Sequence, residues 1–185
     1  AVHVKHKVLH STTMCGSGGV HSILTMRTAS SGPGGERSGD RVIVGCGDGS
    51  VSVFEGQRNG AQTCRTYQRG PPNACSVMLD GCVSALQLRG FDEQTGELRL
   101  VAGTYAGSVY AMSLSVADQR AMNAPDATKQ MLTESHSAGI VAVAYPRDNC
   151  EIFATASKDG TVRVWDVNTY TVIAQAQCQT STAGE

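Results

Sequence analysis

The sequence predicts an all-β protein: a partial β-propeller with about three four-stranded blades and one strand of a preceding blade. Three observations lead to this prediction. A glycine-centred turn motif recurs along the chain, strand-like apolar runs surround each copy, and the composition favours short strands and turns over long helices. Of 185 residues, 21 are glycine, 41% are hydrophobic and 17% are charged, a balance typical of a globular domain with its own core.

The repeated motif is centred on Gly49, Gly107 and Gly160. Each glycine is followed by Ser or Thr and then by Val, in the segments GDGSVSVFEG, AGSVYAMSL and KDGTVRVWDV. Similar spacings between the copies indicate repeated structural units. A bulky apolar residue stands at the fifth position after each glycine: Phe54, Met112 and Trp165.

Strand-like runs lie on both sides of each motif, and the Asp-Gly pairs at 48–49 and 159–160 predict tight hairpin turns, because glycine accepts positive φ. Four short strands per repeated unit are typical of a propeller blade. Several runs are apolar at nearly every position, as expected for sheets covered on both faces. A β-sandwich of unrelated hairpins is the alternative, but it does not require aligned Gly-Ser/Thr-Val triplets. In chain order the runs are VHSILTM, RVIVGCG and TCRTYQ, then CVSALQL, LRLVAGT and KQMLTE, then IVAVAY, IFATAS and TVIAQAQ.

The repeats predict the domain organisation. The units exceed the usual length of a blade, and the excess falls in polar, turn-rich segments at 30–40, 90–97 and 116–129, where insertions are tolerated and a partner could be recognised. The expected divisions are an outer strand of a preceding blade at 1–10, blade one at 11–70, a degenerate blade two at 71–135, blade three at 136–180 and a tail at 181–185.

The third unit contains a polar pattern around the chain's one tryptophan. His136 precedes the first expected strand, Ser157 ends the second, Asp159 lies in the hairpin turn and Trp165 lies in the third strand. The pattern resembles the WD-repeat family, in which such a His, Ser or Thr, Asp and Trp form a hydrogen-bonded tetrad within one blade. The resemblance implies that these four residues form a structural tetrad, in which every buried polar group has a partner.

The other two units keep only parts of this pattern. Unit one keeps Asp48 but has a cysteine at the serine position and Phe54 in place of tryptophan, whereas unit two keeps Thr104 but has alanine for aspartate and Met112 for tryptophan. Packing residues are thus repeated and polar ones are not.

Two enzymatic interpretations have less support. A hydrolase triad of Ser157, His136 and Asp159 lacks a nucleophile elbow and an evident oxyanion hole. A thiol pair of Cys150 and His136 lacks a recognisable feature that lowers the thiol pKa. We therefore expect no enzyme activity, no catalytic residue and no cofactor.

The composition of the chain limits the kinds of partner that we expect. A net charge of −1 gives no field that attracts nucleic acid or anionic lipid, and no apolar run approaches the length of a membrane helix. The seven cysteines show no C-x-x-C or zinc-site spacing, so we expect no metal site. Several cysteines, such as Cys46 and Cys82, lie among apolar neighbours, which suggests free thiols in a reducing compartment such as the cytoplasm. We expect protein partners.

Three blades are too few to close a propeller, which needs four or more. We therefore expect a piece of a larger propeller protein, or copies that associate through open blade faces.

Longer strings extend the resemblance over most of residues 41–175. They are similar to the two-propeller WD-repeat proteins of cilia and flagella that lie inside doublet microtubules, and the glycine-rich segment at 30–40 departs from that family. The resemblance implies a non-catalytic scaffold of the axoneme, part of the cytoskeleton, with tubulin and axonemal proteins as partners; it assigns no contact residues. The alternative is a WD-repeat adaptor of another cytoplasmic complex, such as a ubiquitin-ligase substrate receptor or a transport adaptor. The strings are VGCGDGSV, GCVSALQLRG, LVAGTYAGSVYAMSL and HSAGIVAVAYPRDNCEIFATASKDGTVRVWDVNT.

Overall fold

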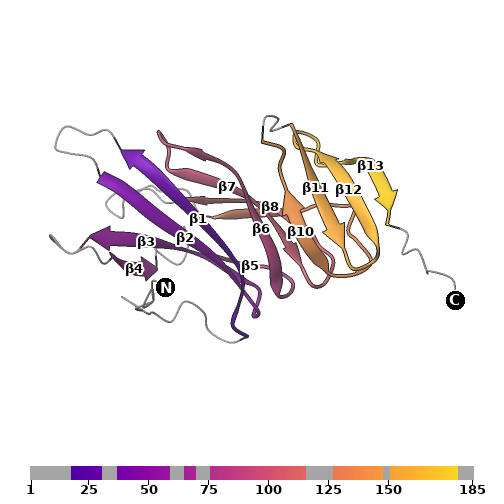
Figure 1. The fold of residues 1–185 in the computed structure, drawn as a ribbon, viewed down its shortest axis with the longest axis horizontal. Helices are drawn as coiled ribbons and strands as arrows, with labels where there is room; N and C mark the ends of the chain where they lie inside the picture. Colours follow the sequence, from indigo (N-terminus) through magenta and orange to yellow (C-terminus); the bar gives the residue numbers. More distant parts are fainter. Residues whose placement is uncertain are drawn as a thin grey trace, which may run out of the picture.

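The fold consists of three antiparallel β-sheets stacked side by side (Figure 1). A computed structural model describes residues 18–30, 37–58, 65–69, 76–115, 127–147 and 151–178. Every regular element within these ranges is a strand. The all-β prediction and the partial propeller architecture are therefore confirmed, while the expected strand at 1–10 and the tail at 181–185 lie outside the described residues.

The first sheet has the order β1-β2-β3-β4, and β5 also pairs with β3. Strands β4 and β5 pair with different halves of β3, at Phe54–Arg58 and Ser50–Ser52, so together they act as one interrupted outer strand. The first sheet thus continues to Met78, and the expected boundary at residue 70 moves to the segment between β5 and β6. Its strands are β1 (Val20–Ser30), β2 (Arg37–Cys46), β3 (Ser50–Arg58), β4 (Arg65–Arg69) and β5 (Ser76–Met78).

The second and third sheets are regular four-stranded meanders, with the orders β6-β7-β8-β9 and β10-β11-β12-β13. Both lie within the ranges expected for blades two and three. The second sheet contains β6 (Val83–Asp92), β7 (Glu97–Thr104), β8 (Val109–Ser115) and β9 (Thr128–Met131); the third contains β10 (Ile140–Ala144), β11 (Ile152–Ser157), β12 (Thr161–Asp166) and β13 (Val172–Gln177).

The repeated glycines form the same turn in each sheet. Gly49, Gly107 and Gly160 have φ of 88°, 91° and 79°, which side chains with a Cβ rarely adopt. Each glycine N–H donates to the carbonyl three residues earlier, and each glycine carbonyl accepts an N–H from the segment that follows the outer strand, at Leu79, His136 and Cys178. The turn prediction is confirmed.

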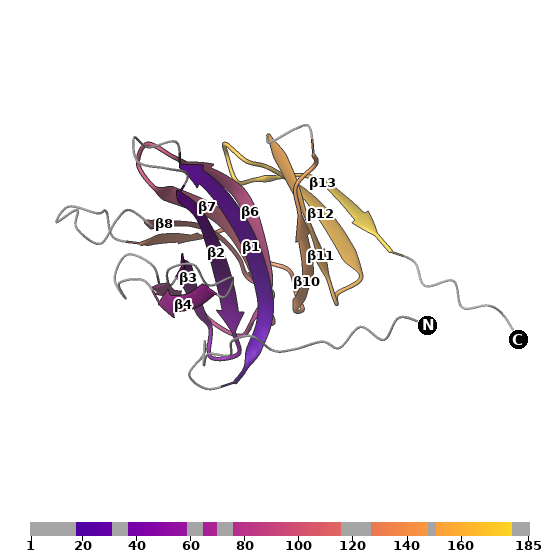
Figure 2. The same ribbon diagram turned by 60° about the vertical axis from the view of Figure 1, so that its left-hand side comes forward.

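The cores lie between neighbouring sheets, whose arrangement Figure 2 shows from a second side. Strand β8 shows why its sequence is apolar at successive positions: Tyr110 and Met112 pack in the core shared with the first sheet, whereas Val109 and Ala111 pack in the core shared with the third. The expectation that strands are covered on both faces is therefore confirmed for β8, whereas β9 of the same sheet is exposed.

Glycines allow the closest approach between sheets. A Cβ added to Gly103 on β7 would lie 2.3 Å from Cγ2 of Ile140 on β10, and one added to Gly45 on β2 would lie 2.6 Å from Cγ1 of Val83 on β6. Beside these contacts Ser84 Oγ donates to the Ile140 carbonyl, at 2.5 Å, and Ser22 Oγ donates to the Val83 carbonyl, at 2.9 Å. The same joint thus connects the first sheet to the second and the second to the third.

Candidate functional site

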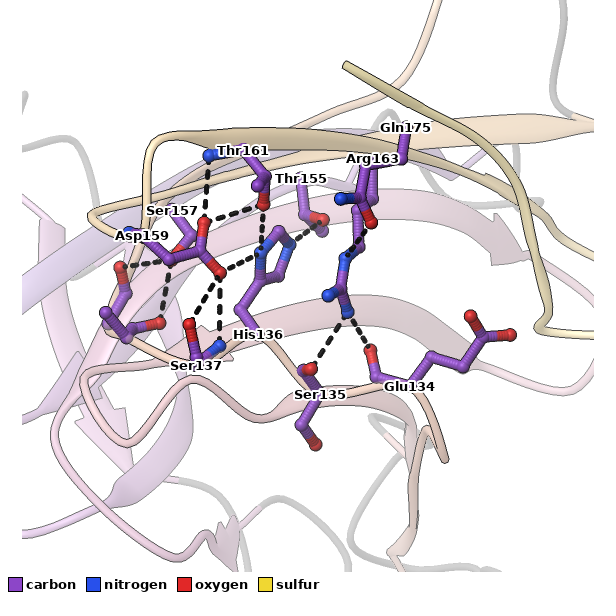
Figure 3. A network of polar contacts seen from close by, with 12 residues as sticks. Glu134, Ser135, His136, Ser137, Thr155, Ser157, Asp159, Thr161, Arg163 and Gln175 are labelled. Carbon is purple, nitrogen blue, oxygen red and sulfur yellow. Dashed lines mark hydrogen bonds and ion pairs between the residues drawn. The ribbon is translucent and has the colours of Figure 1, made fainter. Parts of the chain in front are cut away.

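A buried polar network joins strands β11 and β12 of the third sheet to the segment that precedes β10 (Figure 3). His136 enters from the segment between β9 and β10, Thr155 lies on β11, and Asp159 and Thr161 flank the turn glycine before Trp165 on β12. Side chains on alternate positions of β11 and β12 share one face, which brings the hydroxyl and the indole to the imidazole.

One chain of hydrogen bonds joins the indole to the carboxylate. Trp165 Nε1–H donates to Thr155 Oγ1 at 2.8 Å, and this hydroxyl lies 2.8 Å from His136 Nε2. His136 Nδ1 lies 3.0 Å from Asp159 Oδ2. Since an indole only donates and a carboxylate only accepts, the Thr155 hydroxyl donates to Nε2 and the imidazole carries its proton on Nδ1. This assignment gives every group in the chain a partner.

Asp159 anchors the turn as well as the imidazole. Its Oδ1 accepts from the Thr161 N–H at 2.9 Å and from the Thr161 hydroxyl at 2.6 Å, and its Oδ2 accepts from the Ser137 N–H at 3.1 Å. Burial alone would raise the pKa of this carboxyl, but the hydrogen bonds from Thr161, Ser137 and His136 hold its pKa well below the usual range. Asp159 is therefore a charged, fully engaged acceptor at neutral pH.

The structure corrects one member of the expected tetrad. Ser157 does not join the imidazole and the indole; its hydroxyl donates to the carbonyl of Ala138 at 2.8 Å and accepts the Asp159 N–H at 3.2 Å. Thr155 holds the expected serine position in the network instead. Both side chains point to the same face of β11, but Trp165 stacks on its cross-strand neighbour Phe153, with ring centroids 5.7 Å apart, which brings its N–H to the nearer hydroxyl.

The sequence analysis also missed Thr161 and Arg163. The Arg163 Nη1 donates to the carbonyls of Glu134 and Ser135 at 2.9 and 2.8 Å, and its Nε donates to Gln175 at 3.1 Å. Arg163 thereby ties the segment before His136 to β12 and β13. Alternation places Arg163 on the same face of β12 as the buried Thr161 and Trp165, but no local signal shows which carbonyls it meets.

The other sheets replace this network by packing. In the first sheet Asp48 Oδ1 accepts from the Ser50 hydroxyl at 2.7 Å, and Phe54 is buried. In the second sheet Met112 is buried and the carboxylate comes from Asp80, which accepts from the Ser108 hydroxyl at 2.5 Å.

The positions equivalent to Thr155 are apolar in both of these sheets, where Val44 and Ala102 are fully buried. Thr104, expected to replace the tetrad serine, is fully buried, and its hydroxyl has no hydrogen-bond partner. The polar network is therefore specific to the third sheet among the described residues.

The hydrogen bonds run from Thr155 to His136 to Asp159, the same order of residue types as in a hydrolase triad. The surroundings of these residues do not suit a triad. Thr155 is 1% exposed and His136 4% exposed, and the hydroxyl already binds the indole N–H. A nucleophile must reach a substrate, so the geometry favours a structural role. Ser157, the nucleophile considered from the sequence, bonds to backbone groups, and Cys150 lies outside the described residues.

Acid is expected to destabilise the fold through His136. Burial lowers the pKa of this imidazole below its ordinary value, against the opposing effect of Asp159. The unfolded chain thus binds a proton that the folded chain does not, and stability falls as the pH drops below about 6.5. Melting temperature measured by circular dichroism should decrease from pH 7.5 to 5. His136→Gln should flatten this dependence, whereas His21→Gln, at an exposed position, should preserve it; equal slopes for both variants would contradict the assignment.

The cysteines depart from the sequence expectation at one position. Cys46 is fully buried, as its apolar neighbours suggested, but it forms a disulfide, so the expectation of a free thiol there is wrong. Burial and pairing are compatible, and pairing cannot be deduced from sequence alone. Cys82 and Cys178 are free, and burial raises the pKa of the Cys82 thiol.

Within the described ranges, no three His, Cys, Asp or Glu side chains are grouped so as to hold a metal ion. The same ranges contain no helix that could span a membrane.

Comparison with known proteins connects the network to a family. Residues 128–166, from β9 to the end of β12, match the family described as WD domain, G-beta repeat. A search of curated proteins found no match to the chain. The matched segment contains His136, Thr155, Asp159 and Trp165, so the part of the chain that is similar to a WD repeat is the part that holds the buried network.

Proposed function

We propose that this chain is a non-catalytic protein-interaction scaffold of the WD-repeat type. The observation that carries the proposal is the complete internal use of the polar network: His136, Thr155 and Asp159 bond to one another and to the fold. The buried network stiffens the third sheet. Binding is then a property of exposed turns, rims and sheet faces, where a rigid scaffold commonly presents its contact residues.

We further propose that the scaffold belongs to the axoneme of a cilium or flagellum and binds tubulin and axonemal proteins inside doublet microtubules. The support is the resemblance of the strings between residues 41 and 175 to the WD-repeat proteins of cilia and flagella. A net charge of −1 is compatible with such a contact, because docking on a lattice need not depend on long-range attraction.

The expected axonemal position is tested by expressing the tagged chain in ciliated cells. Signal along the axoneme and recovery of tubulin in a pull-down are the expected results. Signal confined to the cell body, with recovery of ubiquitin-ligase or transport-adaptor subunits, would contradict the axonemal proposal and favour the adaptor alternative.

The disulfide at Cys46 is unusual for a cytoplasmic protein. Rapid alkylation and mass spectrometry of the same material should establish whether Cys46 is oxidised in the cell.

Self-association through an open sheet face forms part of the proposal. On the third sheet, Val141 and Ile173 are 49% and 57% exposed, although both lie on strands. The third sheet shares its buried core with the second sheet, so its opposite face, where no further described sheet packs, is suited to a protein contact. Light scattering on the purified chain should give a mass above that of one copy; a monomer at all concentrations would contradict pairing.

A further inference from the structure

A groove between the second sheet and the β12–β13 turn of the third contains more positive than negative side chains. Its volume is about 480 Å³, within the range of binding sites for a few side chains. Arg89 on β6, Arg99 on β7 and Lys129 on β9 line it, together with Glu97 and Tyr170. Strand β8 contributes apolar surface to the same groove. Its described lining thus combines three cations with one carboxylate.

The single carboxylate neutralises only one of these cations. Glu97 Oε2 accepts from Arg99 Nε at 3.2 Å and from Arg99 Nη2 at 2.9 Å. Lys129 Nζ donates to the Met78 carbonyl, a neutral group that leaves the ammonium charge uncompensated. Arg89 donates from Nη1 to the Tyr170 hydroxyl at 3.0 Å, again to a neutral group. The groove therefore retains positive charge at Arg89 and Lys129.

Arg89 and Tyr170 are arranged to receive an acceptor. A guanidinium has five N–H donors, and the hydrogen bond to Tyr170 uses one of those on Arg89. The Tyr170 oxygen accepts that bond, so its own O–H proton stays available for donation. Two donors from different sheets thus converge at one end of the groove, and a carboxylate can accept from both.

The backbone of Tyr170 adds an independent observation. Its φ is 56°, the only positive φ among the described residues other than glycine, and such a conformation is unfavourable for a bulky side chain. The turn is held by Asp166, whose Oδ1 accepts the N–H groups of Asn168 and Thr169 at 2.8 Å each. A glycine would suit this backbone better, so the aromatic side chain is present despite the local conformation.

We propose that this groove binds an acidic, extended segment of a partner protein, with an Asp or Glu carboxylate held by the Arg89 guanidinium and the Tyr170 hydroxyl. The groove is lined mostly by strand residues, which suits an extended peptide lying along it. Bidentate pairing is the usual geometry for an arginine and a carboxylate, and Lys129 adds attraction for a second acidic side chain. This inference rests on the coarser proposal of a protein-binding scaffold and is independent of the axonemal one.

The probe is a fluorescein-labelled hexaglutamate peptide, titrated with the full chain at low salt and followed by fluorescence anisotropy. Hexaglutamine serves as the uncharged control peptide. Arg89→Gln should weaken hexaglutamate binding about tenfold, as expected for the loss of one charge-assisted interaction. Tyr170→Phe keeps the ring and should cause a smaller loss, of about threefold.

Arg147→Gln is the matched control, because Arg147 is exposed and lies on the β10–β11 connection, away from the groove lining. It removes the same charge and should leave binding within about twofold of the wild type. Equal weakening by Arg147→Gln and Arg89→Gln, or equal binding of hexaglutamine and hexaglutamate, would overturn the proposal. Arg89→Lys keeps the charge but not the planar fork, so partial recovery of binding relative to Arg89→Gln is expected. These outcomes differ from a failure of axonemal targeting, which would leave the peptide result unchanged.

Discussion

Thr155→Val is expected to lower the free energy of unfolding by about 3 kcal/mol, because each buried polar group left unpaired costs about 1–3 kcal/mol. Valine preserves the shape of threonine and removes the hydroxyl that joins two rings. The Trp165 N–H then loses its acceptor and His136 Nε2 loses its donor. Chemical denaturation followed by circular dichroism measures the change.

Ser157→Ala is the matched control, since Ser157 lies two residues away on the same strand and bonds only to backbone groups in the described network. We expect a loss of about 1 kcal/mol. A double-mutant cycle of Thr155→Val with Trp165→Phe should show coupling, because both changes remove the same hydrogen bond. A larger loss for Ser157→Ala than for Thr155→Val would return the serine to the tetrad and contradict the network described above.

Gly103→Ala is expected to destabilise the joint between the second and third sheets by about 3 kcal/mol, the upper part of the range for overpacked cores. The new Cβ would lie 2.3 Å from Cγ2 and 2.6 Å from Cβ of Ile140, atoms of a β-branched side chain that cannot rotate away. The sheets must separate or shift, which also disturbs the Ser84 hydrogen bond to the Ile140 carbonyl. Thermal unfolding followed by circular dichroism gives the change in stability.

Gly90→Ala provides the same substitution in the same sheet, at a position where an added Cβ meets no atom within 4 Å. It should leave the melting temperature nearly unchanged. Ile140→Ala removes the nearest methyl group but costs about 2–5 kcal/mol by itself, so the double variant should lose less stability than the sum of the two single changes. Tolerance of Gly103→Ala would show that the sheets do not approach as closely as described.

The fold could be predicted from sequence because its signals are local. The turn at Gly160 needs a positive φ, and Thr161 and Trp165 follow it on one face of β12, so one short segment defines both a hairpin and its buried face. The interrupted outer strand of the first sheet could not be predicted in this way. Strands β4 and β5 are short and both depend on pairing with β3, a non-local contact.

The candidate site was predictable by residue type but not by contact. His136, Asp159 and Trp165 carry the chemistry of a hydrogen-bonded network, and the structure brings them together. The choice between Thr155 and Ser157 depends on where the indole lies across β11, which the sequence of one strand does not contain. The groove at Arg89 likewise depends on segments far apart in the chain.

The central claim is that the polar network of the third sheet is an internal, structural feature. The chain has one tryptophan, so a ¹H–¹⁵N spectrum contains one indole N–H signal, and its hydrogen exchange reports directly on the Trp165 bond to Thr155. With Trp165 fully buried, the account predicts exchange that requires global unfolding and accelerates strongly in Thr155→Val. Exchange at the rate of an exposed indole, in a chain that is otherwise folded, would contradict it.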